Sequence, residues 1–158
     1  MSNGRARMAA AAQFARAAQK NARATHSREQ AMRIFARKGA GADAARIIVS
    51  EQGANVAVED PELIRGRHND VVIWFCENQT RGDITVELRD FRLRFRRNPP
   101  APVDFHTPNP IPVPARSTAL IYGTVNRDPR VLEFFKYTVR VTAGNRVHDH
   151  DPDLEIKP

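Results

Sequence analysis

Val71–Arg97, VVIWFCENQTRGDITVELRDFRLRFRR, is the stretch that decides the fold. Its first part, Val71–Cys76, is apolar at every position, which predicts a central strand covered on both faces. From Ile84 the chain alternates between apolar and polar side chains, as a strand with one face on a core does. Turn-forming residues at 78–82 separate the two parts, so we expect the strands to pair as an antiparallel hairpin.

The alternation of the second strand slips by one residue at Asp90. The apolar positions are Ile84, Val86 and Leu88 before the slip and Phe91, Leu93 and Phe95 after it. Such a slip turns later side chains to the opposite face unless an extra residue is absorbed. We therefore expect a β-bulge at Arg89–Asp90, after which Arg92, Arg94 and Arg96 form a basic stripe on the solvent face.

Net charge is unevenly distributed along the 158 residues. The chain carries a formal charge of +7, with 25 Lys and Arg against 18 Asp and Glu. Residues 1–38 hold nine of these cations and one of the acids, so the rest of the chain is close to neutral. This pattern argues against a nucleic-acid surface that spans residues 39–158. It predicts that electrostatic contacts with a partner are confined to the basic segment 1–38.

The basic segment is rich in alanine. No Gly or Pro interrupts Ala9–Ala24, and Ser27–Gln30 fits a helix capping box. Alanine buries little surface, so we expect this segment to be helical or disordered. We assign residues 1–45 to a basic arm with its linker and residues 46–158 to a β domain. A solvated tail is the competing interpretation. The cations expected to contact an acidic partner are Arg16, Lys20, Arg23 and Arg28.

The cysteine count and the hydropathy pattern limit the chemistry and the compartment. Cys76 is the single cysteine, which excludes an intramolecular disulfide and a cysteine-rich zinc site. No apolar run approaches the roughly 20 residues that a membrane helix needs. The arginine- and alanine-rich start also resembles an organelle transit peptide, but it is poor in serine. We therefore expect a cytoplasmic protein without a transmembrane segment.

Short strand patterns separated by turn residues fill the rest of the chain. Asn98–Pro114 holds seven of the eleven prolines, so we expect a strand-free crossover that lies on the body through its apolar residues. Partner binding by this segment is the alternative. Lys136–Thr142 alternates, with Tyr137, Val139 and Val141 expected to point inward. About eight such strands predict an all-β protein, an antiparallel Greek-key β-sandwich.

Five segments of the chain combine strand-forming and turn-forming residues in an order that can be compared with known folds. They are Val58–Leu63, Asn69–Asn78, Val113–Thr118, Tyr137–Val141 and Asp151–Ile156. On these segments the body, residues 46–158, resembles the cupredoxin-like β-sandwiches and, more loosely, the immunoglobulin-like ones. A pattern of this kind is specific for architecture and says little about function.

The cupredoxin family holds a type 1 copper with two histidines, a cysteine and usually a methionine, because this mixed ligand set fixes the copper geometry. In the family the first histidine follows the asparagine after the tryptophan-bearing strand, whereas Asn78 is followed here by Gln79. The late strand Val139–Val141 offers no cysteine, and all three methionines lie before residue 33. The resemblance therefore implies a copper-free domain of the kind used in binding or assembly, and we expect no cofactor.

A separate metal hypothesis concerns the segment from His148 to Asp153. If this segment is extended, His148 and His150 share one face, and Asp149 and Asp151 lie on the other. Such a set suits a loose metal site, whereas Asp-Pro-Asp is also ordinary turn chemistry. The candidate ligands are His148, His150, Asp149 and Asp151.

The sequence contains no nucleophile motif, glycine-rich phosphate loop or convincing Ser/His/Asp set. The stripe of Arg92, Arg94 and Arg96 suits phosphate binding, although a solvated face neutralised by nearby acids is favoured. We therefore expect a non-enzymatic binding or assembly module whose basic arm contacts an acidic protein partner, as a monomer or a homo-oligomer. The alternatives are a nucleic-acid-binding protein that uses the arm and this stripe, and a metal-binding protein that uses His148 and His150.

Overall fold

Two sheets make up the computed structural model, which describes residues 41–59, 61, 63–93 and 99–158. Sheet A contains, in spatial order, β2 (Asn55–Val58), β1 (Ala42–Gln52), β4 (Val71–Asn78), β8 (Thr118–Val125) and β6 (Val103–Phe105). Sheet B contains β3 (Ile64–Arg67), β11 (Asp153–Lys157), β9 (Glu133–Ala143), β5 (Ile84–Leu93) and β7 (Ile111–Val113), and β10 (Arg146–His150) pairs with β9.

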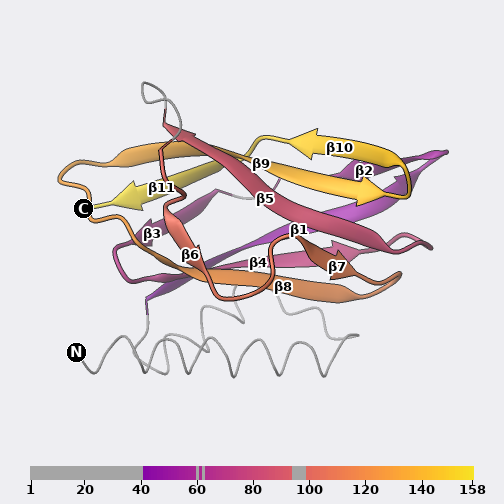
Figure 1. Ribbon diagram of the computed structural model, residues 1–158, viewed down its shortest axis with the longest axis horizontal. Helices are drawn as coiled ribbons and strands as arrows, with labels where there is room; N and C mark the ends of the chain where they lie inside the picture. Colours follow the sequence, from indigo (N-terminus) through magenta and orange to yellow (C-terminus); the bar gives the residue numbers. More distant parts are fainter. Residues whose placement is uncertain (1–40, 60, 62, 94–98) are drawn as a thin grey trace.

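The sheets pack face to face, which confirms the predicted all-β sandwich. Figure 1 shows β4 and β8 in the lower layer and β5, β9 and β10 in the upper one. Most strand pairs are antiparallel, but β1 runs parallel to β4, and β3 runs parallel to β11. The described residues contain no helical segment with the length and apolarity to cross a bilayer. Residues 1–40, and with them Arg16, Lys20, Arg23 and Arg28, lie outside the described residues.

Strand β4 is the central strand that the sequence predicts. Its residues from Val71 to Cys76 are at most 2% exposed, so both of its faces are covered. The predicted hairpin with β5 is wrong, because β4 pairs with β1 on one edge and with β8 on the other. No edge remains for β5, which lies in sheet B and pairs with β7 and β9.

The connection between β4 and β5 is a corner that carries the chain from sheet A to sheet B. Asn78 is 1% exposed at this corner. Its side-chain amide donates to the carbonyl oxygens of Gly82 at 2.8 Å and Val113 at 3.0 Å. Its Oδ1 accepts from the Thr80 amide at 2.9 Å. One buried side chain therefore holds the corner to the segment that leads into β8.

The predicted β-bulge in β5 is confirmed. The register between β5 and β9 shifts between Arg89 and Arg92, and Asp90 adopts a positive φ of 53°. The extra residue keeps Phe91 on the core side, where it is 8% exposed. A bulge absorbs one residue in this way without inverting the rest of the strand.

The β domain begins earlier than the sequence predicts. Strand β1 starts at Ala42, not near Arg46, and pairs in parallel with β4 from the pair Ala42–Val71 onward. Ala44 and Ala45 are fully buried. Alanine has a weak strand preference, but sheet pairing and burial override it at these positions.

The proline-rich crossover is not free of strands. It contains β6 and β7, and Val103 and Val113 are buried, so the prediction that it lies on the body is confirmed. Pro112 is tolerated because β7 pairs with β5 as the last strand of sheet B. Just before β7 in the chain, the Asn109 side chain bonds both the amide and the carbonyl of Leu88, at 2.9 and 2.8 Å. It thus replaces a strand residue at this edge.

Aromatic side chains fill one region between the sheets. The Trp74 indole nitrogen donates to the Tyr137 hydroxyl at 2.9 Å, and the Phe91 ring stacks on Tyr137 with centroids 5.2 Å apart. Phe105 lies 6.0 Å from Trp74. As predicted, Tyr137 and the alternate residues after it in β9 point inward and are fully buried.

Candidate functional site

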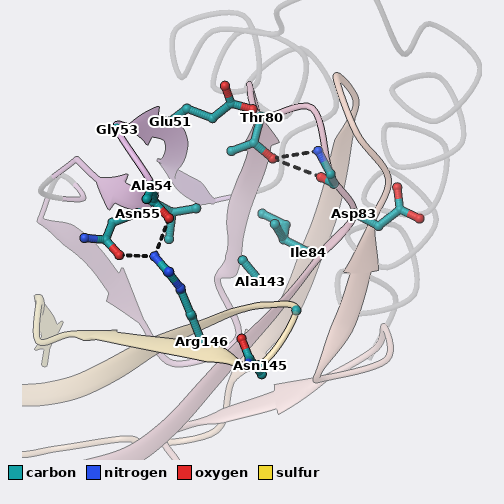
Figure 2. Close-up of a pocket in the computed structure, with 13 residues that line it drawn as sticks. Glu51, Gly53, Ala54, Asn55, Thr80, Asp83, Ile84, Ala143, Asn145 and Arg146 are labelled. Carbon is teal, nitrogen blue, oxygen red and sulfur yellow. Dashed lines mark hydrogen bonds between the residues drawn. The ribbon is translucent and has the colours of Figure 1, made fainter.

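Three connections meet at one end of the sandwich and enclose an open cleft of about 390 Å³. They are the β1–β2 turn, the β4–β5 corner and the β9–β10 turn (Figure 2). Arg146 spans the cleft wall, where its guanidinium donates to the carbonyl oxygen of Ala54 and to the side-chain oxygen of Asn55. This cation therefore ties β10 of sheet B to the β1–β2 turn of sheet A.

The polar groups on the other side of the cleft are also bonded within the protein. Thr80 Oγ1 donates to the Gly82 carbonyl at 2.9 Å (Figure 2). Asp83 accepts from the Ala115 amide at 2.9 Å, and Glu51 accepts from the Arg81 amide at 2.7 Å. The described lining contains no histidine, cysteine or serine. The cleft thus lies where the two sheets are joined, and these polar side chains are held by hydrogen bonds within the protein.

Two titratable side chains lie deep in the core. Burial raises the pKa of the Cys76 thiol to about 12, which keeps it protonated and unreactive near neutral pH. Burial is also the main cause that raises the pKa of Tyr137. Both groups pack in the interior instead of facing a cleft, in agreement with the interpretation of Cys76 as a small buried thiol.

Of the predicted basic stripe, the structure places Arg92; Arg94 and Arg96 lie outside the described residues. The Arg92 guanidinium lies 3.1 Å from the Asp151 carboxylate and donates to the Asp90 carbonyl at 2.9 Å. Its neighbour Arg89 pairs with both Glu87 and Asp90. Acids on the same face therefore neutralise the described part of the stripe, as the favoured interpretation expects.

The candidate metal ligands lie on two faces of the C-terminal strands. His148 and His150 pair with Val141 and Val139, whose side chains point inward, whereas Asp149 pairs with Arg140 on the outer face. Asp149 accepts two hydrogen bonds from Arg140 at 2.8 Å. Nowhere in the described chain do three or more His, Cys, Asp or Glu side chains gather as a metal site would require. Metal binding by these residues stays a prediction.

The outer-face ion pair gives a testable pH dependence. Hydrogen bonds from Arg140 lower the pKa of Asp149, so the stabilisation is present above the unfolded-state pKa and is lost as the pH falls through the folded-state pKa. Replacing Arg140 by Gln should raise the Asp149 pKa toward its ordinary range, as measured by carboxyl NMR titration. Asp151 is the control, because a hydrogen bond from Thr138 is the main cause of its lowered pKa. Its pKa should therefore change little in the Arg140 variant. A pKa of Asp149 that stays low in the variant contradicts the pairing.

An exposed apolar surface lies at the opposite end of sheet B from the cleft. Val131 is 71% exposed, Leu132 41% and Phe134 56%. We call these three residues the apolar surface. A hollow of about 360 Å³ adjoins Phe134 and is lined also by Phe135 and Lys136. Large exposed hydrophobic groups that gather in one place mark interaction sites more often than single ones do.

The apolar surface is held in place by its surroundings. Arg127 and Glu133, which flank the loop that carries Val131 and Leu132, form two hydrogen bonds of 2.8 Å. The Arg127 guanidinium also lies 5.4 Å from the centre of the buried Phe135 ring. These contacts fix both ends of the loop, so the apolar side chains are presented on a preformed segment.

Sequence reasoning missed this surface, although a signal was present. Phe134 and Phe135 are adjacent in the sequence and lie in strand β9. Because consecutive strand residues point to opposite faces, only one of the two rings can enter the core. Phe135 is fully buried and Phe134 is exposed.

No protein-family model and no curated protein matches the sequence. Among solved structures, the chain resembles the CsuC–CsuE chaperone–tip adhesion subunit complex from Acinetobacter baumannii, with a TM-score of 0.51 and 10% identity over 60% of this chain and 48% of that one. The CupB2 chaperone of Pseudomonas aeruginosa has a TM-score of 0.48 and 13% identity over 61% and 52%. The chain thus spans about half the length of these two matched chains.

A multicopper oxidase also appears among the similar structures. The McoA multicopper oxidase of Aquifex aeolicus has a TM-score of 0.43 and 11% identity, over 76% of this chain and 30% of that one. At these identities the similarity shows the fold alone, a two-sheet β-sandwich.

Proposed function

We propose that the protein is a non-enzymatic binding or assembly module that holds a protein partner on the apolar surface. The observation that carries this proposal is the concentration of exposed hydrophobic side chains. Of the four large hydrophobic residues that are exposed in the described chain, three form the apolar surface and the fourth is Val147 in β10. Keeping three such side chains in water is unfavourable, so a partner that covers them gains free energy on binding.

The surroundings of Phe134 indicate the chemistry of this partner. Lys136 pairs with Asp153 at 3.2 Å, and Arg65 pairs with Glu155 at 2.6 Å, so the nearby charges are balanced. An apolar centre with a polar rim is the usual anatomy of a protein interface. We therefore assign an apolar segment of a partner protein to this surface, with acidic residues elsewhere on the partner contacting the basic arm.

Replacing Phe134 by Glu should weaken binding of the partner at least about tenfold, because a central aromatic contact is lost and a charge is placed in an apolar interface. The partner is first captured from an extract with the wild-type chain and identified, and its affinity is then measured with purified proteins. Val147→Glu is the matched control, since Val147 is 58% exposed but lies outside the apolar surface.

Equal affinities of the two variants for the purified partner would contradict the proposal. Light scattering on the wild-type chain separates a second copy of the chain from a different protein as the occupant. The nucleic-acid alternative predicts binding that weakens steeply with salt. Arg92, the described member of that stripe, is already paired with Asp151, so we favour a protein partner.

A further inference from the structure

The outward face of sheet A is apolar at its centre. Five of its side chains are buried to 2% exposure or less but do not belong to the core between the sheets. They are Ala44, Val71, Ile73, Phe75 and Leu120. They are neighbours across β1, β4 and β8, where Ala44 pairs with Ile73 and Phe75 pairs with Leu120. We call these five residues the outer apolar face.

Sheet B cannot be the cover of this face, because it packs on the opposite face of sheet A, against Trp74 and the rest of the core cluster. All strands of the described chain belong to one of the two sheets. Along β1 and β4 the face ends at the ion pair between Arg46 and Glu77, and on its β6 side it is bordered by the ring contact between His106 and Tyr122, which pairs with Ile73. The buried state of its centre therefore requires a further layer.

We propose that residues 1–40 of the same chain form this layer, with their apolar side chains on the outer apolar face and their cations toward solvent. The other residues that the structure does not describe are 60, 62 and 94–98. These seven residues are too few to cover five side chains. The described chain begins at Gly41, whose carbonyl accepts a hydrogen bond from the Val71 amide at 3.0 Å. Residues 1–40 thus join the sheet directly beside a member of the face.

The dimensions and the chemistry of residues 1–40 fit this role. A helix over Ala9–Ala24 would be about 24 Å long, and the eight residues of β4 span about 27 Å. Alanine side chains allow a helix backbone to approach a sheet closely, and Phe14 and Phe35 supply large apolar groups. The cations between them can remain in water. The proposal concerns the face of the sandwich opposite the apolar surface and does not depend on the binding function.

Hydrogen exchange of the full wild-type chain tests the proposal without any substitution. If residues 1–40 pack on the sheet, amides within Ala9–Ala24 should exchange at least about 100-fold more slowly than in an unstructured peptide. Exchange at unstructured rates throughout residues 1–40 would overturn the proposal. If the amides are unprotected and light scattering shows a dimer, a second copy of the chain covers the outer apolar face. That result would also overturn the proposal.

A pair of variants of the full chain gives a second test. Phe14→Ser with Phe35→Ser should lower the melting temperature by about 5 °C or more and increase binding of a hydrophobic dye, because the outer apolar face becomes exposed. The matched control is Arg16→Ser with Arg37→Ser, which removes large side chains expected to face water and should leave both readouts near wild type. Equal melting temperatures for the two double variants would overturn the proposal.

Discussion

Replacing Trp74 by alanine is expected to lower the free energy of unfolding by about 3–5 kcal/mol, as measured by urea denaturation. Trp74 is fully buried, and its ring contacts Phe105 and Tyr137 with centroid distances of 6.0 and 5.9 Å. Its removal opens a cavity and leaves the buried Tyr137 hydroxyl without the 2.9 Å hydrogen bond from the indole.

Two further variants test whether the loss of unfolding free energy comes from the contacts of Trp74 with Phe105 and Tyr137. Tyr137→Phe keeps the ring but leaves the buried indole N–H without its acceptor, so we expect a smaller loss of about 1–3 kcal/mol. Phe134→Ala removes an aromatic ring that is 56% exposed and should change stability by less than about 1 kcal/mol. A similar loss for Trp74→Ala and Phe134→Ala would contradict the position of Trp74 in the core.

Replacing Asn78 by alanine is expected to cost about 2–4 kcal/mol of unfolding free energy, because buried backbone groups lose their partners. The Asn78 side chain bonds the carbonyl oxygens of Gly82 and Val113 and the amide of Thr80. These bonds hold the corner at which the chain passes from sheet A to sheet B. Chemical denaturation with two spectroscopic probes gives the measurement.

Asn126 provides a matched control for the corner. Its side chain also bonds a backbone carbonyl, that of Ala101 at 3.0 Å, and the carboxylate of Asp104 at 2.8 Å, but it is exposed to solvent. Water replaces lost hydrogen bonds at an exposed site, so Asn126→Ala should cost less than about 1 kcal/mol. Equal losses for the two variants would show that Asn78 does not hold the corner.

Local patterns in the sequence predict much of this fold. The apolar run of β4, the slip at Asp90 and the alternation after Lys136 depend on neighbouring residues, and the structure confirms each of them. The pairing of β4 could not be predicted in the same way. It depends on the pairing of β4 with β1, from Ala42–Val71 to Val49–Asn78, and with β8, which joins distant parts of the chain. The hairpin hypothesis considered only the nearest strand.

The candidate sites show the same limit. The sequence places Arg92 on a polar face, but it does not show that Asp151, which is far away in the chain, neutralises this cation. Likewise, the double phenylalanine at 134–135 indicates that one ring leaves the core, but the pairing of Arg127 with Glu133 that fixes the preceding loop is visible in the fold alone. Sequence patterns therefore predict on which face of a strand a side chain lies. The distant residues that contact it are known only from the fold.

The most direct test of the binding function is site-specific photo-crosslinking in the full chain. A benzophenone-bearing amino acid is introduced at position 134 in one protein and at position 147 in another, since both native side chains are more than half exposed. We predict that the protein modified at position 134 crosslinks to one defined partner protein and that the protein modified at position 147 does not. Crosslinking of that partner from position 147 alone, or from both positions equally, would contradict the assignment of the apolar surface.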